Sequence, residues 1–146
     1  MDRQAVYETL KVDEGVKYEI YLDHLGLKTF GVGHLVTDKD PEDALVVGDS
    51  VSEERVFACF DADLDVSISE CKLLFPTFDD FPEEAQQVIV NMMFNMGRPR
   101  LSGFKKFCLA ANSGDWATAA AEGRDSKWYQ QVTNRAERLM SRLEAI

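Results

Sequence analysis

The stretch that most constrains the fold runs from Asp13 to Leu35, because a short turn within it is flanked by alternating polar and apolar residues. The first alternating run is Lys17–Leu22, and the second covers residues 28–34. Between them lies Asp23-His24-Leu25-Gly26, which opens on an acidic residue and closes on glycine, as turns often do. Alternation with a period of two on both sides of such a turn predicts a β-hairpin.

Helical periodicity surrounds this hairpin on both sides. Val6 and Leu10 predict a short amphipathic helix that ends near Gly15. Ser50 or Ser52 is expected to cap a long helix over residues 53–74. A helix that is apolar nearly all round, and therefore buried, is predicted for residues 83–96. Further helices are expected over residues 102–112 and 116–123 and at the C-terminus.

The composition indicates one globular domain. The 146 residues are enough to bury a core, and 45% hydrophobic with 10% aromatic residues excludes a disordered chain. With 26 acidic and 16 basic residues the net charge is −10, which argues against nucleic acid as a partner, since phosphate binding needs a basic surface. A solvated acidic surface that aids solubility explains the same charge.

The three cysteines form no metal or disulfide motif. Cys59, Cys71 and Cys108 lack CxxC spacing and neighbouring histidines, and an odd number cannot all pair. We therefore expect reduced, buried thiols, no metal site and no cofactor. No apolar signal segment or membrane-spanning run is found, so we expect synthesis in the cytoplasm without direct membrane anchoring.

Two carboxylates near the hairpin form the strongest candidate catalytic pair. Gly15 can adopt the left-handed conformation that ends a helix, which would hold Glu14 at the mouth of the hairpin, while Asp23 begins the turn. Glycoside hydrolysis needs one carboxyl that protonates the leaving oxygen and a second group that deals with water or the sugar cation. On spacing alone, both residues are more simply explained as ordinary surface acids.

Two other features near the hairpin have structural explanations. We interpret His34 as a structural histidine paired with a carboxylate, for which Asp63 is a candidate. Residues 61–69 imitate the start of a calcium loop. However, Val66 stands where the loop needs glycine and Lys72 where it needs a bidentate acid, so no calcium site is predicted.

Polar residues in the second half of the chain leave alternatives open. Asn91 and Asn95 lie four residues apart in an otherwise apolar helix, so their amides either line a cleft or tie the backbone. Arg135, near the start of the last helix, either pairs with a carboxylate or is solvated.

Taken together, the sequence resembles the phage-type lysozymes, the glycoside hydrolases of the bacteriophage endolysin kind. The pattern DEGxxxxIYxDxxGxxTxGxGHL covers residues 13–35. Segments similar to the family follow in the same order along nearly the whole chain: FDADLD (60–65), NMMFNMG (91–97), SGF (102–104), SKWY (126–129) and TNRA (133–136).

This resemblance implies a single lysozyme domain over residues 1–146, with a two-lobed α+β fold. A small lobe with the β-hairpin would cover about residues 12–52, and a helix over about residues 53–74 would connect it to a mainly helical lobe of residues 70–146 with 1–11. The resemblance also implies hydrolysis of the β-1,4 bond between N-acetylmuramic acid and N-acetylglucosamine in peptidoglycan, without metal or cofactor.

The roles of single residues are likewise implied by matching position. Glu14 would be the general acid, while Asp23 and Thr29 would place the attacking water of an inverting reaction. Arg135 would hold Glu14 by a salt bridge, and His34 and Asp63 would form a structural pair. The saccharide cleft would be lined by the Gly33 backbone, Leu35, Asn91, Phe94 and Phe104.

Three rival functions differ in what they need from the chain. A non-catalytic peptidoglycan-binding protein has no reason to keep Glu14, Asp23 and Thr29 together. A lytic transglycosylase needs no water-placing Asp23 and leaves a 1,6-anhydro end on its product. A calcium-linked adaptor would rest on the acidic run. We expect a monomer. A viral chain would need a separate holin-like permeabilising protein, whereas a cellular organism would use the enzyme against bacteria.

Overall fold

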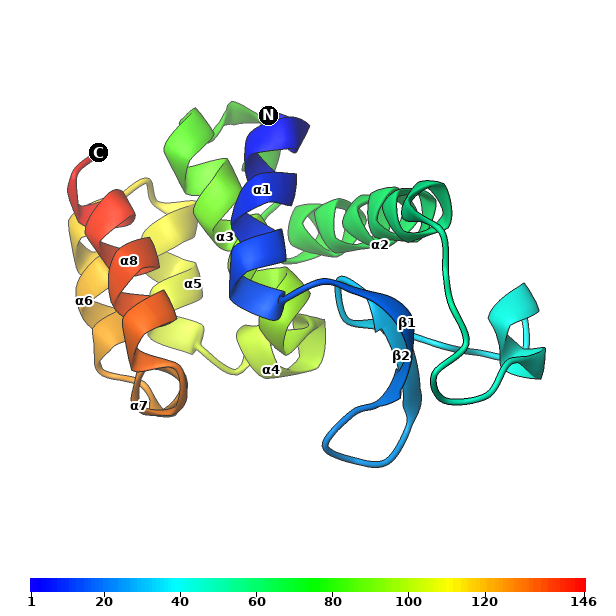
Figure 1. Cartoon of the computed structure of the whole chain (residues 1–146). Helices are drawn as coiled ribbons and strands as arrows, with labels where there is room; N and C mark the ends of the chain where they lie inside the picture. Colours follow the sequence, from blue (N-terminus) through cyan, green and yellow to red (C-terminus); the bar gives the residue numbers. More distant parts are fainter. The chain divides into compact units, whose positions relative to one another are not determined.

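The computed structural model describes residues 1–146 and has the predicted α+β fold, with eight α-helices and one small antiparallel sheet (Figure 1). The chain divides into two compact units. Residues 7–65 form what we call the hairpin unit, and residues 1–6 with 66–146 form the helical unit. None of the helices combines the length and the apolar character that a membrane span requires.

The sheet of the hairpin unit has the strand order β1-β2-β3, and both pairings are antiparallel. Its strands are β1 (Lys17–Leu22), β2 (Lys28–Gly31) and β3 (His34–Leu35). Tyr21 lies opposite Thr29, and Thr29 lies opposite Leu35. Because residues directly opposite each other share a face of the sheet, Thr29 stands between Tyr21 and Leu35 on one face.

The prediction of one continuous second strand over residues 28–34 is wrong, because a tight turn divides this segment into β2 and β3. Gly31 and Gly33 have φ angles of 64° and 67°, in the left-handed region that other residues rarely adopt. A Cβ atom on Gly31 would also lie 3.1 Å from Val56 Cγ1. The alternating pattern therefore continues through residues where the two glycines reverse the chain.

The two helices nearest the hairpin begin and end close to the predicted positions. Helix α1 (Arg3–Glu14) is followed by Gly15 at a φ of 75°, which explains why the helix ends at Glu14. Helix α2 (Glu53–Leu74) has the predicted bounds, and Ser52 is its cap, since its Oγ accepts a hydrogen bond from the Arg55 amide at 3.2 Å. Residues 61–69, which resemble the start of a calcium-binding loop, lie inside this helix.

The connection between β3 and α2 includes the short 3-10 helix η1 (Pro41–Ala44). Two backbone hydrogen bonds connect this segment to the sheet. The Ile20 amide donates to the Asp49 carbonyl, and the Gly48 amide donates to the Ile20 carbonyl, each at 2.9 Å. Gly48 has a φ of 94° in this connection. The loop is therefore tied to β1 by main-chain hydrogen bonds.

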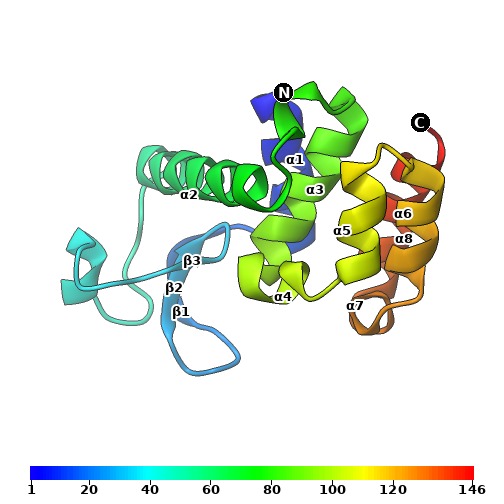
Figure 2. The same cartoon turned by 180° about the vertical axis from the view of Figure 1, so that it is seen from behind.

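The helical unit is built around buried faces of its longer helices. Its remaining elements are η2 (Phe78–Asp80), α3 (Glu83–Met96), α4 (Arg98–Ser102), α5 (Lys105–Asn112), α6 (Trp116–Arg124), α7 (Lys127–Gln131) and α8 (Thr133–Glu144). Helix α6 packs against α5 and α8, and α8 also packs against α3 (Figure 2). Ile89 of α3 and Leu143 of α8 are fully buried. Helix α4 was not predicted from the sequence; its Pro99 lies in the first turn, a position that proline suits.

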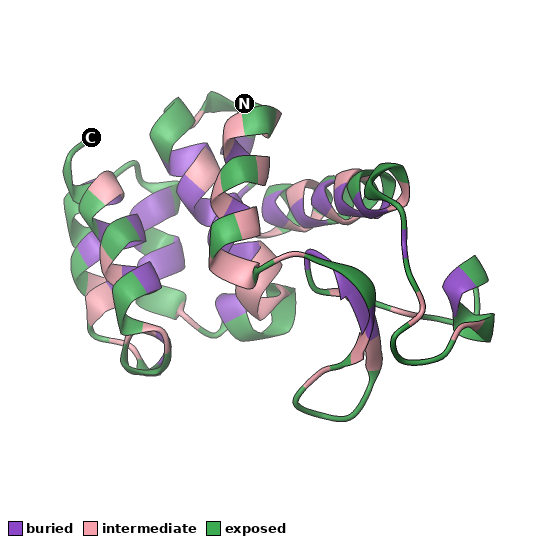
Figure 3. Ribbon diagram, viewed as in Figure 1, coloured by how far each residue is buried: buried purple, intermediate pink, exposed green.

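Burial differs along the chain, as the colours in Figure 3 show. The helices of the helical unit carry buried stripes, whereas the loop between β1 and β2 is largely exposed. Leu25, at the tip of that loop, is 70% exposed. Phe30 and Ile20, by contrast, are fully buried within the sheet. The hairpin therefore has a buried base and an exposed tip.

Candidate active site

Glu14 is the last residue of α1, and its side chain is half-buried. The left-handed turn at Gly15 carries the chain directly from the helix into β1. A Cβ atom placed on Gly33 would lie 3.9 Å from Glu14 Oε2. The carboxylate of Glu14 therefore faces the backbone of the β2–β3 turn, where glycine leaves room for it.

Asp23 closes the tip of the hairpin with its own side chain. Its Oδ1 accepts hydrogen bonds from the amides of Leu25 and Leu27, both at 2.9 Å. The Leu27 amide bond, followed by the Leu25 bond, holds the pKa of the Asp23 carboxyl below its ordinary value. Asp23 is therefore a fixed, ionised carboxylate at neutral pH.

Thr29 is positioned by the same turn residue. The Thr29 hydroxyl donates a hydrogen bond to the Leu27 carbonyl at 2.9 Å, and the Asp23 amide donates to that carbonyl at 2.9 Å as well. Thr29 is only 4% exposed. Because its proton is committed to Leu27, the lone pairs of the hydroxyl oxygen point elsewhere and can accept a hydrogen bond from water. Leu27 thus orients both Asp23 and Thr29.

Tyr21 is a residue of this site that the sequence did not single out. Burial raises the pKa of its hydroxyl above the ordinary value, and the negative charges of Asp23 and then Glu14 raise it further. Both carboxylates therefore lie within electrostatic reach of one hydroxyl. Tyr21 also stands opposite Thr29 in the sheet. Alternation placed Tyr21 on a strand, but only the register of the hairpin brings it beside Thr29.

His34 is held between two carboxylates. Its Nδ1 lies 2.7 Å from Asp63 Oδ2, and its Nε2 lies 3.0 Å from Asp40 Oδ2. The hydrogen bond to Asp63 is the main reason why the pKa of His34 is raised, with a smaller contribution from Asp40. Asp63 was considered as a partner from the sequence, whereas Asp40, in an apparently ordinary polar loop, was not.

Arg55 extends this set of ion pairs along the loop. Its guanidinium binds both carboxylate oxygens of Glu42, at 2.8 and 2.9 Å, and its Nη2 lies 3.2 Å from Asp40 Oδ1. Glu42 is only 7% exposed. Five ionisable side chains of the hairpin unit thus form one continuous cluster, which we call the loop network: His34, Asp40, Glu42, Arg55 and Asp63.

Four of the predicted site residues belong to the helical unit. Asn91 is 2% exposed, and its Oδ1 accepts a hydrogen bond from Arg135 Nε at 2.9 Å. Arg135 itself is 8% exposed, so the alternative that it is solvated is wrong. Phe94 on α3 and Phe104 before α5 are half-buried. Their predicted contacts with a saccharide, and that of Arg135 with Glu14, stay predictions.

Asn95 of α3 bonds a side chain of another helix. Its Oδ1 accepts a hydrogen bond from Trp128 Nε1 at 2.8 Å. Together with the bond between Asn91 and Arg135, this shows that the two amides tie α3 to side chains of α7 and α8. Both amides thus connect helices, a role that neither of the two alternatives, lining a cleft or tying the backbone, had named.

Comparison with known proteins shows similarity along nearly the whole chain. The sequence model of the family described as phage lysozyme matches residues 11–145. Probable T4-type lysozyme 1 of Dictyostelium discoideum is 31% identical, and Probable T4-type lysozyme 2 of the same organism is 30% identical; both alignments cover 96% of this chain and 94% of the relative. Pre-baseplate central spike protein Gp5 of Enterobacteria phage T4 is 29% identical over 92% of this chain and 27% of its own length. The similarity includes both the hairpin unit and the helical unit.

Proposed function

The chain belongs to the phage lysozyme family, and on this premise we propose that it cleaves the β-1,4 bond between N-acetylmuramic acid and N-acetylglucosamine with inversion at the anomeric carbon. Membership of the family makes it a lysozyme, an enzyme that hydrolyses peptidoglycan. The observation that carries the finer proposal is geometric: Asp23 and Thr29 are both hydrogen-bonded to Leu27, while the Glu14 carboxylate faces Gly33 in the β2–β3 turn of the same unit.

We assign the general acid to Glu14. In the inverting reaction its carboxylic acid gives a proton to the glycosidic oxygen as the bond to the anomeric carbon breaks. Its position supports this role, because it lies at a helix end that opens toward the glycine turn rather than on a helix face. Gly33, which leaves space beside this carboxylate, and Leu35, which is 46% exposed, are assigned to sugar binding.

We assign the water to Asp23 and Thr29. The ionised carboxylate of Asp23 accepts a hydrogen bond from water, and the lone pair of Thr29 Oγ1 accepts a second one. As the water oxygen attacks the anomeric carbon, its proton passes to Asp23, so that the enzyme returns to its first state after exchange of one proton with solvent. Because both residues are anchored on Leu27, the water is fixed without rearrangement of the hairpin.

The products distinguish this proposal from its rivals. Purified peptidoglycan would be digested, and the new ends would be observed by NMR before the anomers equilibrate. Inversion of a β bond predicts reducing ends that first appear as the α anomer. Reducing ends that first appear as the β anomer would contradict the inverting mechanism, and a 1,6-anhydro end would identify a lytic transglycosylase. Binding without soluble products would indicate a non-catalytic binder.

The biological setting is proposed more broadly. Cell lysis as the outcome, synthesis in a host cytoplasm, a holin-like partner for a viral chain and a monomeric state all remain predictions from the sequence. The net charge of −10 opposes approach to an anionic wall, and salt screens this repulsion over a shorter distance as its concentration rises. We therefore expect the activity to rise with salt before it falls.

A further inference from the structure

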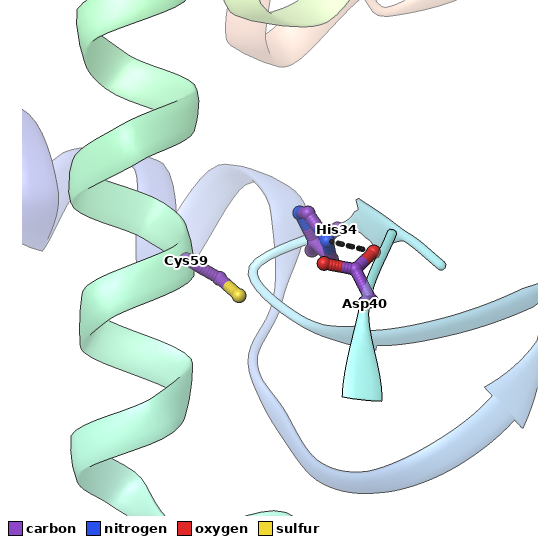
Figure 4. Close-up of side chains that lie close together, drawn as sticks. All are labelled: His34, Asp40 and Cys59. Atoms are coloured by element: carbon purple, nitrogen blue, oxygen red, sulfur yellow. Dashed lines mark hydrogen bonds and ion pairs between the residues drawn. The ribbon is translucent and has the colours of Figure 1, made fainter. Parts of the chain in front are cut away.

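Three different metal-ligating groups meet in the hairpin unit without taking part in the proposed reaction. His34 comes from β3, Asp40 from the loop that follows, and Cys59 from α2 (Figure 4). One ligand atom from each lies within 4.8 Å of the other two. In Figure 4 the sulfur of Cys59 points from α2 toward the imidazole and the carboxylate. The spacing of these three residues in the sequence does not predict a site, because only the fold brings them together.

Asp63 orients the histidine in the way that metal-binding histidines require. Its Oδ2 lies 2.7 Å from His34 Nδ1 and accepts a hydrogen bond from that nitrogen. The other ring nitrogen, Nε2, faces Asp40 Oδ2 at 3.0 Å. A carboxylate that binds the far nitrogen fixes the ring and its tautomer and makes the near nitrogen a better ligand. Asp63 is not itself one of the three ligand residues.

We propose that His34 Nε2, the Asp40 carboxylate and the Cys59 thiolate form a binding site for a divalent cation of the zinc class. The mixed nitrogen, oxygen and sulfur donors suit zinc or cobalt, whereas calcium and magnesium prefer oxygen ligands only. Three protein ligands leave a fourth tetrahedral position for water. The site would join β3, the loop and α2.

The geometry is close to what a tetrahedral zinc site needs. Zinc bonds of about 2.0–2.2 Å to nitrogen and oxygen place those two ligand atoms about 3.3 Å apart. The distance between His34 Nε2 and Asp40 Oδ2 is 3.0 Å. A bond of about 2.3 Å to sulfur would put Cys59 Sγ about 3.6 Å from the other ligand atoms. Since all three atoms already lie within 4.8 Å of one another, Cys59 needs to approach by no more than about 1.2 Å.

The charges around the site are compatible with a cation. Asp63 and Glu42 add negative charge, and Arg55 supplies an adjacent positive group, which is shared with Glu42. Burial raises the pKa of the Cys59 thiol to about 11, so the cation displaces the thiol proton as it binds. It also replaces any proton shared between His34 Nε2 and Asp40. The cation thus takes the place of protons that otherwise hold the same groups together.

Cobalt binding to the whole chain tests this directly. After dialysis against a chelator, the protein would be titrated with Co²⁺ and then with Zn²⁺, while the near-ultraviolet absorption is recorded. We expect a thiolate-to-cobalt charge-transfer band that Zn²⁺ removes, together with a higher unfolding temperature in Zn²⁺. No such band in the folded wild type at millimolar Co²⁺ would overturn the proposal.

Matched cysteine variants identify the ligand. Cys59→Ser should lose the band and bind Zn²⁺ at least tenfold more weakly, whereas Cys108→Ser, which alters another buried thiol, should keep both. Asp63→Asn should weaken Zn²⁺ binding by about 10–100-fold while keeping the band, since its side chain acts through His34. A band that survives in folded Cys59→Ser and disappears in Cys108→Ser would place the metal elsewhere and contradict the proposal.

Discussion

The helical unit buries side chains such as Ile89, Trp128 and Leu139 on several of its helices, whereas the hairpin unit buries fewer apolar residues and adds a network of charges. Its loop is held by Arg55 and His34, and its turn by the Asp23 carboxylate. Apolar packing tolerates no water and needs close fit, but hydrogen-bonded charges can remain partly exposed and still act on a ligand. The proposed chemistry thus lies where the chain is held by polar groups.

The largest effect is expected from Asp23→Asn. This substitution separates the role of the side chain in holding the turn from its role as a negative charge beside the water. The amide oxygen still accepts from Leu25 and Leu27, so the midpoint of unfolding should fall only slightly, but the charge that polarises water is lost. We expect the initial rate of peptidoglycan hydrolysis to fall by about 10²–10⁴-fold. Asp38→Asn, which removes the same charge from an exposed position, should keep the rate. Equal rates for the two variants would contradict the assignment of the reaction to the polar hairpin unit.

The second-largest effect is expected from Trp128→Ala in the helical unit, where the stability changes. Trp128 is 1% exposed and its Nε1 bonds Asn95, so truncation leaves both a cavity and an unpaired amide. Urea unfolding should show a loss of about 3–5 kcal/mol in the free energy of unfolding. Leu109→Ala, at a position that is 70% exposed on α5, should change it by less than about 0.5 kcal/mol. If Trp128→Ala cost no more than Leu109→Ala, the stability of the helical unit would not depend on this packing.

A smaller loss of stability is expected from Arg55→Met in the loop network. Methionine keeps the apolar stem but leaves Glu42, at 7% exposure, without its guanidinium. Because the arginine side chain is itself one-third exposed, we expect a loss of only about 1–2 kcal/mol in a buffer with chelator. Adding Glu42→Gln should then cost little more, since the charge to be paired is gone. Fully additive losses would show that the two side chains act independently.

The smallest effect concerns an ion pair on the surface of the helical unit. The Arg124 guanidinium, aided by Tyr129 and Ser141, lowers the pKa of Glu137 from 4.5 to about 2. A carboxyl whose pKa is lower in the folded state stabilises above its unfolded pKa and loses that contribution as the pH falls through its folded pKa. The stability gap between wild type and Glu137→Gln should therefore close between about pH 4.5 and pH 2. A gap that stays constant over this range would contradict the pairing.

Local pattern was enough to predict much of the fold. The apolar spacing of α2 and α3 gave both helices with their observed bounds, and Gly15 marked the end of α1. Alternation also placed β1, but it continued past the point where Gly31 and Gly33 reverse the chain. At Gly31 the space for a side chain is taken by Val56, a contact that a linear pattern does not contain.

The candidate site was predicted where its residues are close in sequence and missed where the fold brings distant residues together. Glu14, Asp23 and Thr29 lie within one continuous motif. Asp40 and Cys59 meet His34 only because the loop and α2 pack beside β3, and their spacing follows no pattern. Residue type alone therefore suggested an ordinary loop and an inert thiol.

The central claim is that Glu14 is the acid of a lysozyme reaction, and the loss of turbidity of chloroform-permeabilised Gram-negative cells tests it most directly. Wild type and Glu14→Gln would be compared at equal concentration across a salt series, after unfolding curves have shown that both are folded. We predict that the wild type clears the cells, with a rate that rises as salt screens its negative charge, and that Glu14→Gln does not clear them at any salt concentration. Substantial clearing by folded Glu14→Gln would contradict the account.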